Sequence, residues 1–129
     1  MMTKSLLTST RRPDVTLRPG GCIEIAAHAA RALRLGRGDV VDVAADGVGG
    51  ELYLYVRHRA PTVGRHEAAV FPTHRRSHHF RAHSARLCRA VAEALGAIPD
   101  ATLRLVCGEP AELPGLGRAL PLIHHKHTQ

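Results

Sequence analysis

Arginine is the residue type that most shapes the chemistry open to this chain. The sequence of 129 residues carries a formal charge of +7, and all but two of its 18 lysine and arginine residues are arginines. A guanidinium group contacts phosphate in a planar, bidentate way, so an arginine-rich chain favours a polyanionic partner. Nucleic acid is therefore the first candidate. The alternative is compositional, because a GC-rich coding sequence raises the alanine and arginine contents together.

Basic residues concentrate between Arg57 and Arg86. This segment holds seven arginines and six histidines but a single acid, Glu67. One interpretation is a phosphate-binding surface, whose affinity would fall steeply with salt. The other is a solvated, flexible linker. We favour binding, because one acid among so many bases is more polarised than solubility requires.

Histidine and arginine also recur at helical spacing in two places. His28, Arg31 and Arg34 follow one another every third residue, and the same three types return 55 positions later as His83, Arg86 and Arg89. Two such helix faces would present guanidinium groups to two segments of duplex DNA. They would equally serve as the wet faces of two amphipathic helices.

The predicted DNA contacts lie on the two expected helices, in the turn after the first, or in the basic segment. They are Arg31, Arg34, Arg37, Arg75, Arg76, Arg81, Arg86 and Arg89. We expect phosphate contacts to supply most of the affinity and a few guanidinium groups to read guanine edges. Double-stranded DNA is the predicted partner.

Other site chemistry is poorly supported. The ten histidines include two clusters, His78-His79 with His83 and the run His124-His125-Lys126-His127. Zinc needs three or four converging ligands, and neither cluster has a suitably spaced cysteine or acid. Cys88 and His83 resemble a thiol and base pair, but the sequence offers them no acid or oxyanion partner. We therefore expect no metal, no cofactor and no enzymatic activity.

Three cysteines, Cys22, Cys88 and Cys107, form no CxxC pair, so we expect reduced, buried thiols rather than a disulfide framework. The chain shows neither the core of a signal peptide nor an apolar run long enough for a membrane span. The expected location is the cytoplasm.

Hydrophobic periodicity predicts a mainly β protein with two short helices. A strand over 16–25, a helix over 26–35 and strands over 40–43 and 51–56 follow one another in the first half, and a similar order follows in the second. Gly96 is expected to end the second helix. The resulting division is a flexible leader (1–14), a first half (15–57), a linker (58–67), a divergent second half (68–123) and a histidine-rich tail (124–129).

The first half also resembles a known family. Its spacing from Ile25 through Leu33 and Leu35 to Gly38-Asp39, followed by the alternating strand Val40-Val41-Asp42-Val43, is similar to the AbrB/MazE (SpoVT-AbrB) domains. The resemblance covers about residues 16–57. It implies a swapped-hairpin barrel in which arginines near the helix and first strand meet DNA.

Carried over by position, the family's helix arginine falls on Arg31 and its strand-opening glycine on Gly21. At two further positions the family has arginine and proline, whereas this chain has Cys22 and Ala26. The expected function is that of a DNA-binding transcriptional regulator. The two departures favour the alternative, a protein-interaction module such as an antitoxin-like or mobile-element accessory protein, with a toxin as one candidate partner.

Family members complete their barrel with two chains. If residues 68–123 are a divergent second copy, one chain would supply both hairpins as an intrachain pseudo-dimer of two strand-helix-strand-strand halves. A homodimer built on the first half is the other alternative.

Overall fold

The computed structural model describes residues 13–47, 50–60, 67–98 and 100–124. Within these ranges the chain forms nine strands and two helices, which confirms the predicted mainly β class with two helices. The elements are β1 (Val15–Leu17), β2 (Cys22–Ile25), α1 (Ala27–Ala32), β3 (Val40–Ala45), β4 (Leu52–His58), β5 (Phe71–Pro72), β6 (Phe80–His83), α2 (Ala85–Ala94), β7 (Leu103–Cys107), β8 (Ala111–Leu113) and β9 (Gly117–His124).

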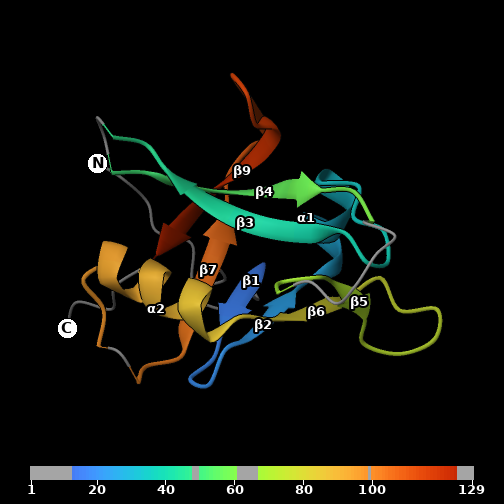
Figure 1. The fold of residues 1–129 in the computed structure, drawn as a ribbon, viewed down its shortest axis with the longest axis horizontal. Coiled ribbons are helices and arrows are strands. Elements are labelled where there is room, and N and C mark those ends of the chain that lie inside the picture. Colours follow the sequence, from blue (N-terminus) through green and yellow to red (C-terminus); the bar gives the residue numbers. More distant parts are fainter. Residues whose placement is uncertain (1–12, 48–49, 61–66, 99, 125–129) are drawn as a thin grey trace, which may run out of the picture.

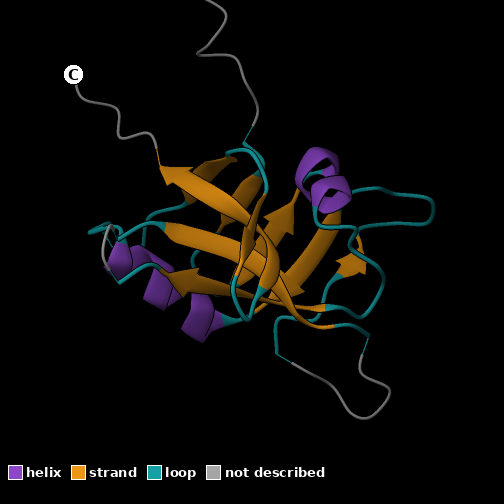
Figure 2. Ribbon diagram, turned by 90° about the horizontal axis from the view of Figure 1, so that it is seen from above, coloured by secondary structure: helices purple, strands orange, loops and turns teal. Residues whose placement is uncertain are grey.

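All the strands belong to one antiparallel sheet that curls into a half-barrel (Figure 1). Its order is β3-β4-β9-β7-β1-β2-β6-β5, and β8 pairs with β9 outside this path. The two helices lie at opposite ends of the sheet in both ribbon views (Figures 1 and 2). Residues far apart in the sequence therefore meet mainly through strand pairing.

The predicted single strand over 16–25 is wrong, because a tight turn divides it into β1 and β2. Gly20 and Gly21 have φ angles of +94° and +108°, a backbone region that L side chains rarely adopt. The predicted inward direction of Ile23 and Ile25 is confirmed, since both side chains are buried. Alternation along β2 thus places these two residues in the core and Glu24 on the outer face.

The segment Ala68–Val70 joins the two ends of the curled sheet. On one side, the Val41 N–H donates to the Ala68 carbonyl at 3.1 Å, and the Val70 N–H donates to the Asp39 carbonyl at 2.8 Å. On the other side, the Ala68 N–H donates to the His83 carbonyl at 3.0 Å. Strand β3 is thereby held near β6, although the two strands lie near opposite ends of the strand order.

The two helices end in the same way. The N–H groups of Arg34 and Leu35 donate to the carbonyls of Arg31 and Ala30, and the equivalent bonds near α2 run from Gly96 and Ala97 to Glu93 and Ala92. Arg34 and Gly96 both have positive φ, 53° and 65°. The predicted stop at Gly96 is confirmed, whereas α1 ends three residues before the predicted Leu35.

The core is aliphatic. Its largest fully buried side chains are Ile23, Ile25, Leu33, Leu54, Leu105, Leu120, Val15, Val41, Val70 and Val91. They come from both halves of the sequence, so neither half buries its apolar face by itself.

Three predicted boundaries shift in the structure. Asp14, placed in the leader, is buried and accepts the Cys107 N–H at 2.8 Å through its carboxylate. His58 completes β4 and His124 completes β9. Residues 1–12 of the predicted leader, the linker core at 61–66 and the tail from 125 onward lie outside the described residues.

Candidate nucleic-acid interface

Four of the eight predicted arginines lie on or beside the β5–β6 hairpin, which carries one exposed aromatic ring. The Arg37 guanidinium lies over the Phe71 ring, 5.4 Å from its centroid, and the ring is 46% exposed. Arg81 is directly opposite Phe71 in the β5–β6 pairing, and Arg75 and Arg76 lie in the loop that joins these strands. We call these five residues, Arg37, Phe71, Arg75, Arg76 and Arg81, the Phe71 surface.

The β5–β6 loop has a defined internal structure. The Thr73 N–H donates to the His79 carbonyl at 3.0 Å, closing the base of the loop. The Ser77 hydroxyl lies 2.9 Å from the Thr73 hydroxyl and accepts the His79 N–H at 3.0 Å. Exposed Arg75 and Arg76 are held at the tip, where Arg76 has a positive φ of 66°.

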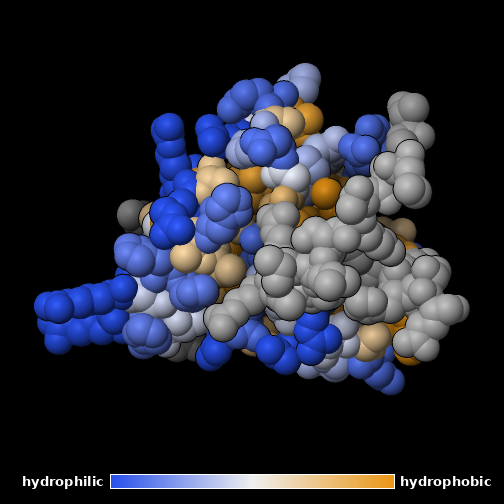
Figure 3. All heavy atoms as spheres, turned by 180° about the vertical axis from the view of Figure 1, so that it is seen from behind, coloured by the Kyte–Doolittle hydropathy of each residue, from blue (hydrophilic) through white to orange (hydrophobic). Residues whose placement is uncertain are grey.

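The first helix stands at the same end of the molecule as this loop in both ribbon views (Figures 1 and 2). Arg31 on α1 and Arg34 just after it are exposed. Seen from behind, hydrophilic residues cover this end, and the β5–β6 loop projects at the left edge (Figure 3). Arg31 and Arg34 thus belong to the same end of the molecule as the β5–β6 loop.

Six of the eight arginines have no ion-pair partner in the part of the chain that the structure describes: Arg31, Arg34, Arg37, Arg75, Arg76 and Arg89. Arg81 lies 3.6 Å from Glu24 across the β2–β6 pairing. The hydrogen bond from Arg18 lowers the pKa of Glu24, and the Arg81 charge lowers it further. Unpaired guanidinium groups are the ones free to take a phosphate.

Arg86 is occupied within the molecule. Its guanidinium donates to Glu67 at 2.6 Å, and the Ser84 hydroxyl donates to the same carboxylate at 2.6 Å. Ser84 is also the N-cap of α2, where its side chain accepts the Leu87 N–H. The Arg86 hydrogen bond, helped by Ser84, holds the pKa of Glu67 below its ordinary value.

No family model, curated protein or solved structure matches the chain. The AbrB/MazE resemblance thus stays a hypothesis. The site must be argued from its own geometry.

The predicted equivalence of the two basic helix stripes is wrong. His83 is the last residue of β6, not a helical residue, and its ring lies 2.9 Å from the Gly20 carbonyl. Arg34 lies beyond the end of α1. A shift of 55 positions therefore aligns the start of α1 with the end of β6, whereas the matched helix ends are 62 positions apart.

Two further arginines have structural roles that spacing did not indicate. The Arg59 guanidinium donates to the Leu33 and Arg34 carbonyls at 3.0 and 2.8 Å and pairs with buried Asp39 at 2.9 Å. Arg118 donates to the Ala32 carbonyl. Both satisfy carbonyls at the C-terminal end of α1 and complement its dipole.

The described cysteines and histidines are considered next. Burial raises the pKa of the Cys88 thiol, which keeps it protonated near neutral pH. Within the described ranges, no group of three histidine, cysteine or acidic residues is arranged to hold a metal ion. None of the helices there is long and apolar enough to cross a membrane.

Proposed function

We propose that this protein binds double-stranded DNA through the Phe71 surface, extended by Arg31 and Arg34, as a transcriptional regulator of the AbrB-like type. The observation that carries the proposal is the gathering of arginines at one end of a molecule with a formal charge of +7, where all but Arg81 have no ion-pair partner among the described residues. Such a role places the protein in the cytoplasm.

The geometry suits phosphate binding. Arg75 and Arg76 stand on a hydrogen-bonded loop, so less conformational freedom is lost when they contact DNA. Asp39, the acid nearest in sequence to Arg37, is buried and paired with Arg59, so it does not neutralise the surface. Most of the affinity would come from phosphates, with base reading left to one or two guanidinium groups.

We also propose that the chain is an intrachain pseudo-dimer with interleaved hairpins. The supporting pattern is the pairing of β2 with β6 and of β4 with β9, which are the corresponding strands of the two halves. Strand β1 pairs with β7, and Val40 of β3 bridges to Ala69, so each half also pairs across to the other. The matching hydrogen bonds at the ends of α1 and α2 also support two copies of one unit.

The decisive experiment compares two double variants with equal loss of charge. Arg75→Ala/Arg76→Ala removes the loop arginines, and the control Arg86→Ala/Arg89→Ala removes two arginines on α2. Binding to a random 20-base-pair duplex is measured by fluorescence anisotropy at several salt concentrations. The loop variant should weaken binding about tenfold or more and reduce the salt slope by about 2, because two phosphate contacts are lost.

The control variant Arg86→Ala/Arg89→Ala should keep nearly the wild-type dependence of DNA affinity on salt concentration. Equal losses in both variants would show that net charge, not the Phe71 surface, determines binding. Wild-type protein that binds no duplex even at low salt would reject the DNA proposal. The chain would then be better described as the alternative, a protein-interaction module that keeps the half-barrel.

A further inference from the structure

Phe71 carries the most exposed aromatic ring of the protein. The chain holds two phenylalanines and two tyrosines. Phe80 is 9% exposed and both tyrosines are half-buried, whereas Phe71 is 46% exposed on β5, the last strand in the sheet order. Phe71 is therefore the ring that a ligand can reach most easily.

The charged neighbours of Phe71 leave part of its ring open. The Arg37 guanidinium lies over the ring, 5.4 Å from its centroid, and so takes one face. Arg81 is directly opposite Phe71 on β6, but its guanidinium lies 3.6 Å from Glu24 on β2. Because β6 separates β5 from β2, Arg81 extends away from the ring. The exposed part of the ring is thus available to a second planar group.

The chemistry of a phenyl ring decides what that planar group is. A phenyl ring has neither charge nor hydrogen-bonding groups, so it adds nothing to the binding of phosphates. An aromatic side chain binds nucleic acid by stacking on the face of a base. In a fully paired duplex the grooves display base edges, and a base face becomes accessible where a nucleotide leaves the stack. Phe71 therefore suits an unpaired base, and the arginines beside it suit the phosphates of that nucleotide.

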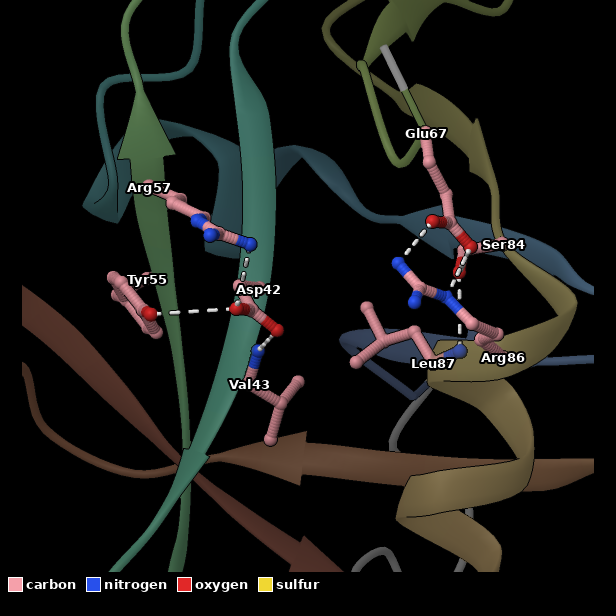
Figure 4. Close-up of polar contacts among 8 residues, drawn as sticks. All are labelled: Asp42, Val43, Tyr55, Arg57, Glu67, Ser84, Arg86 and Leu87. Carbon is pink, nitrogen blue, oxygen red and sulfur yellow. Dashed lines mark hydrogen bonds and ion pairs between the residues drawn. The ribbon is translucent and has the colours of Figure 1, made fainter.

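A cleft of about 440 Å3 between β3 and α2 offers no comparable site. Its lining includes three acids and three arginines but no aromatic ring. Two of these arginines face carboxylates: Arg57 lies 3.8 Å from Asp42, and Arg86 donates to Glu67 at 2.6 Å (Figure 4). At the Phe71 surface, by contrast, three of the four arginines have no ion-pair partner within the described ranges.

We propose that Phe71 stacks on an unpaired base, so that the protein binds duplex DNA containing an unpaired nucleotide in preference to a fully paired duplex. This inference rests on the proposed DNA binding and names the form of DNA that the same surface prefers. Arg75 and Arg76 contact the neighbouring phosphates, because they lie in the loop that joins β5 to β6. Arg37 supports the ring from its covered face through a cation–π contact.

The test compares three duplexes with the full chain, using fluorescence anisotropy. The first is a fully paired 20-base-pair duplex, and the second carries one additional unpaired adenine at its centre. The protein should bind the second about fivefold or more tightly, as expected for one stacked base. The third duplex has an abasic nucleotide in place of the adenine, so it keeps the extra phosphate and the bend but should lose this gain.

Substitutions of Phe71 separate stacking from apolar contact. Phe71→Leu keeps an apolar side chain but no ring and should abolish the preference, whereas Phe71→Tyr should retain it. Ile123→Ala is the matched control, because Ile123 is 43% exposed on β9, outside the Phe71 surface. The quantity compared is the ratio of the two affinities, since the loss of aromatic support for Arg37 would affect both duplexes alike.

NMR spectra of protein with isotope-labelled phenylalanine report on the ring directly. The Phe71 ring protons should shift upfield when the duplex with the unpaired adenine is added, because the ring current of a stacked base shields them. Buried Phe80 is the internal reference and should not shift.

Equal affinity for the paired duplex and the duplex with the unpaired adenine would overturn this inference and leave the DNA proposal standing. A preference that survives Phe71→Leu would overturn it too, because the ring would then not be its cause. Absence of binding to all three duplexes would reject both proposals.

Discussion

At the scale of single residues, Gly21 is the described glycine at which an added Cβ would approach other backbone atoms most closely. Its φ is +108°, and an added Cβ would lie 2.6 Å from the Ala85 nitrogen and 2.9 Å from the Ala85 Cα. The Ser84 N–H also donates to the Gly21 carbonyl at 2.9 Å. Glycine at this position allows the β1–β2 turn to approach the start of α2.

We predict that Gly21→Ala lowers the free energy of unfolding by about 2–4 kcal/mol, since it combines a strained φ with a backbone clash. Gly47→Ala is the matched control, because a Cβ there meets nothing within 4 Å and its φ is not in the positive range. That control should change stability by less than about 0.5 kcal/mol. Urea denaturation followed by circular dichroism measures both, and equal effects would contradict the close-approach argument.

Individual arginines of the basic segment show why composition alone does not define a binding surface. Arg59 and Arg86 belong to the same basic segment as Arg75 and Arg76. The first two are engaged by α1 carbonyls, Asp39 and Glu67, and the second two have no ion-pair partner within the described residues. Their availability for phosphate therefore differs although their residue type does not.

At the scale of elements, the N-terminal end of α2 is stabilised by a network that depends on ionisation. Glu67 accepts from Ser84 and Arg86 beside the first turn, where a negative charge also complements the helix dipole. The Arg86 hydrogen bond depresses the pKa of Glu67. A depressed folded-state pKa stabilises the fold above the ordinary carboxyl pKa, and this contribution is lost as pH falls through the folded-state value.

We therefore predict that Glu67→Gln lowers the melting temperature at pH 7 and that the difference from wild type shrinks as the pH is lowered to about 2.5, because Glu67 is protonated in that direction. Glu93→Gln on the same helix is the control, because no described group forms an ion pair with it. Its melting temperature should stay close to that of the wild type at both pH values. A Glu67→Gln difference that persists at low pH would contradict an electrostatic role.

The β5–β6 loop and α1 illustrate how elements turn sequence into a surface. Bonds among Thr73, Ser77 and His79 shape the loop, and Arg59 together with Arg118 anchors the end of α1. Arg59 and Arg118 both contact residues that are far from them in the sequence. The arginines they present are thereby held at one end of the half-barrel.

At the scale of the whole molecule, the two halves of the chain share one sheet and one core. Strand pairs β2·β6, β4·β9 and β1·β7 all join the halves, so separating them would open the sheet at several places. In a dimer of shorter chains, such pairings would form between two chains instead of within one.

We predict a monomer of 13.9 kDa at micromolar concentration, because the chain already provides both sets of strands. Sedimentation velocity over a range of protein concentrations measures this directly. A dimer that persists on dilution would contradict the intrachain pseudo-dimer and favour a homodimer.

Local patterns in the sequence were enough to predict several features of the fold. Alternation in β2 placed Ile23 and Ile25 in the core, Gly96 marked the end of α2, and the balance of strand and helix followed from periodicity. These features depend on residues within a few positions of one another. Steric preferences of glycine and side-chain alternation are local, so they can be read without the fold.

Tertiary structure alone decided which arginines are available and where they stand. Spacing placed His83 on a helix, but pairing of β6 with β2 holds it in a strand. The partners of Arg59, Arg86 and Arg118 lie 19 or more positions away in sequence. Strand pairing brings such residues together through main-chain hydrogen bonds that many sequences can form, so composition marked Arg75, Arg76 and Arg81 but gave no sign that Arg37 lies over Phe71.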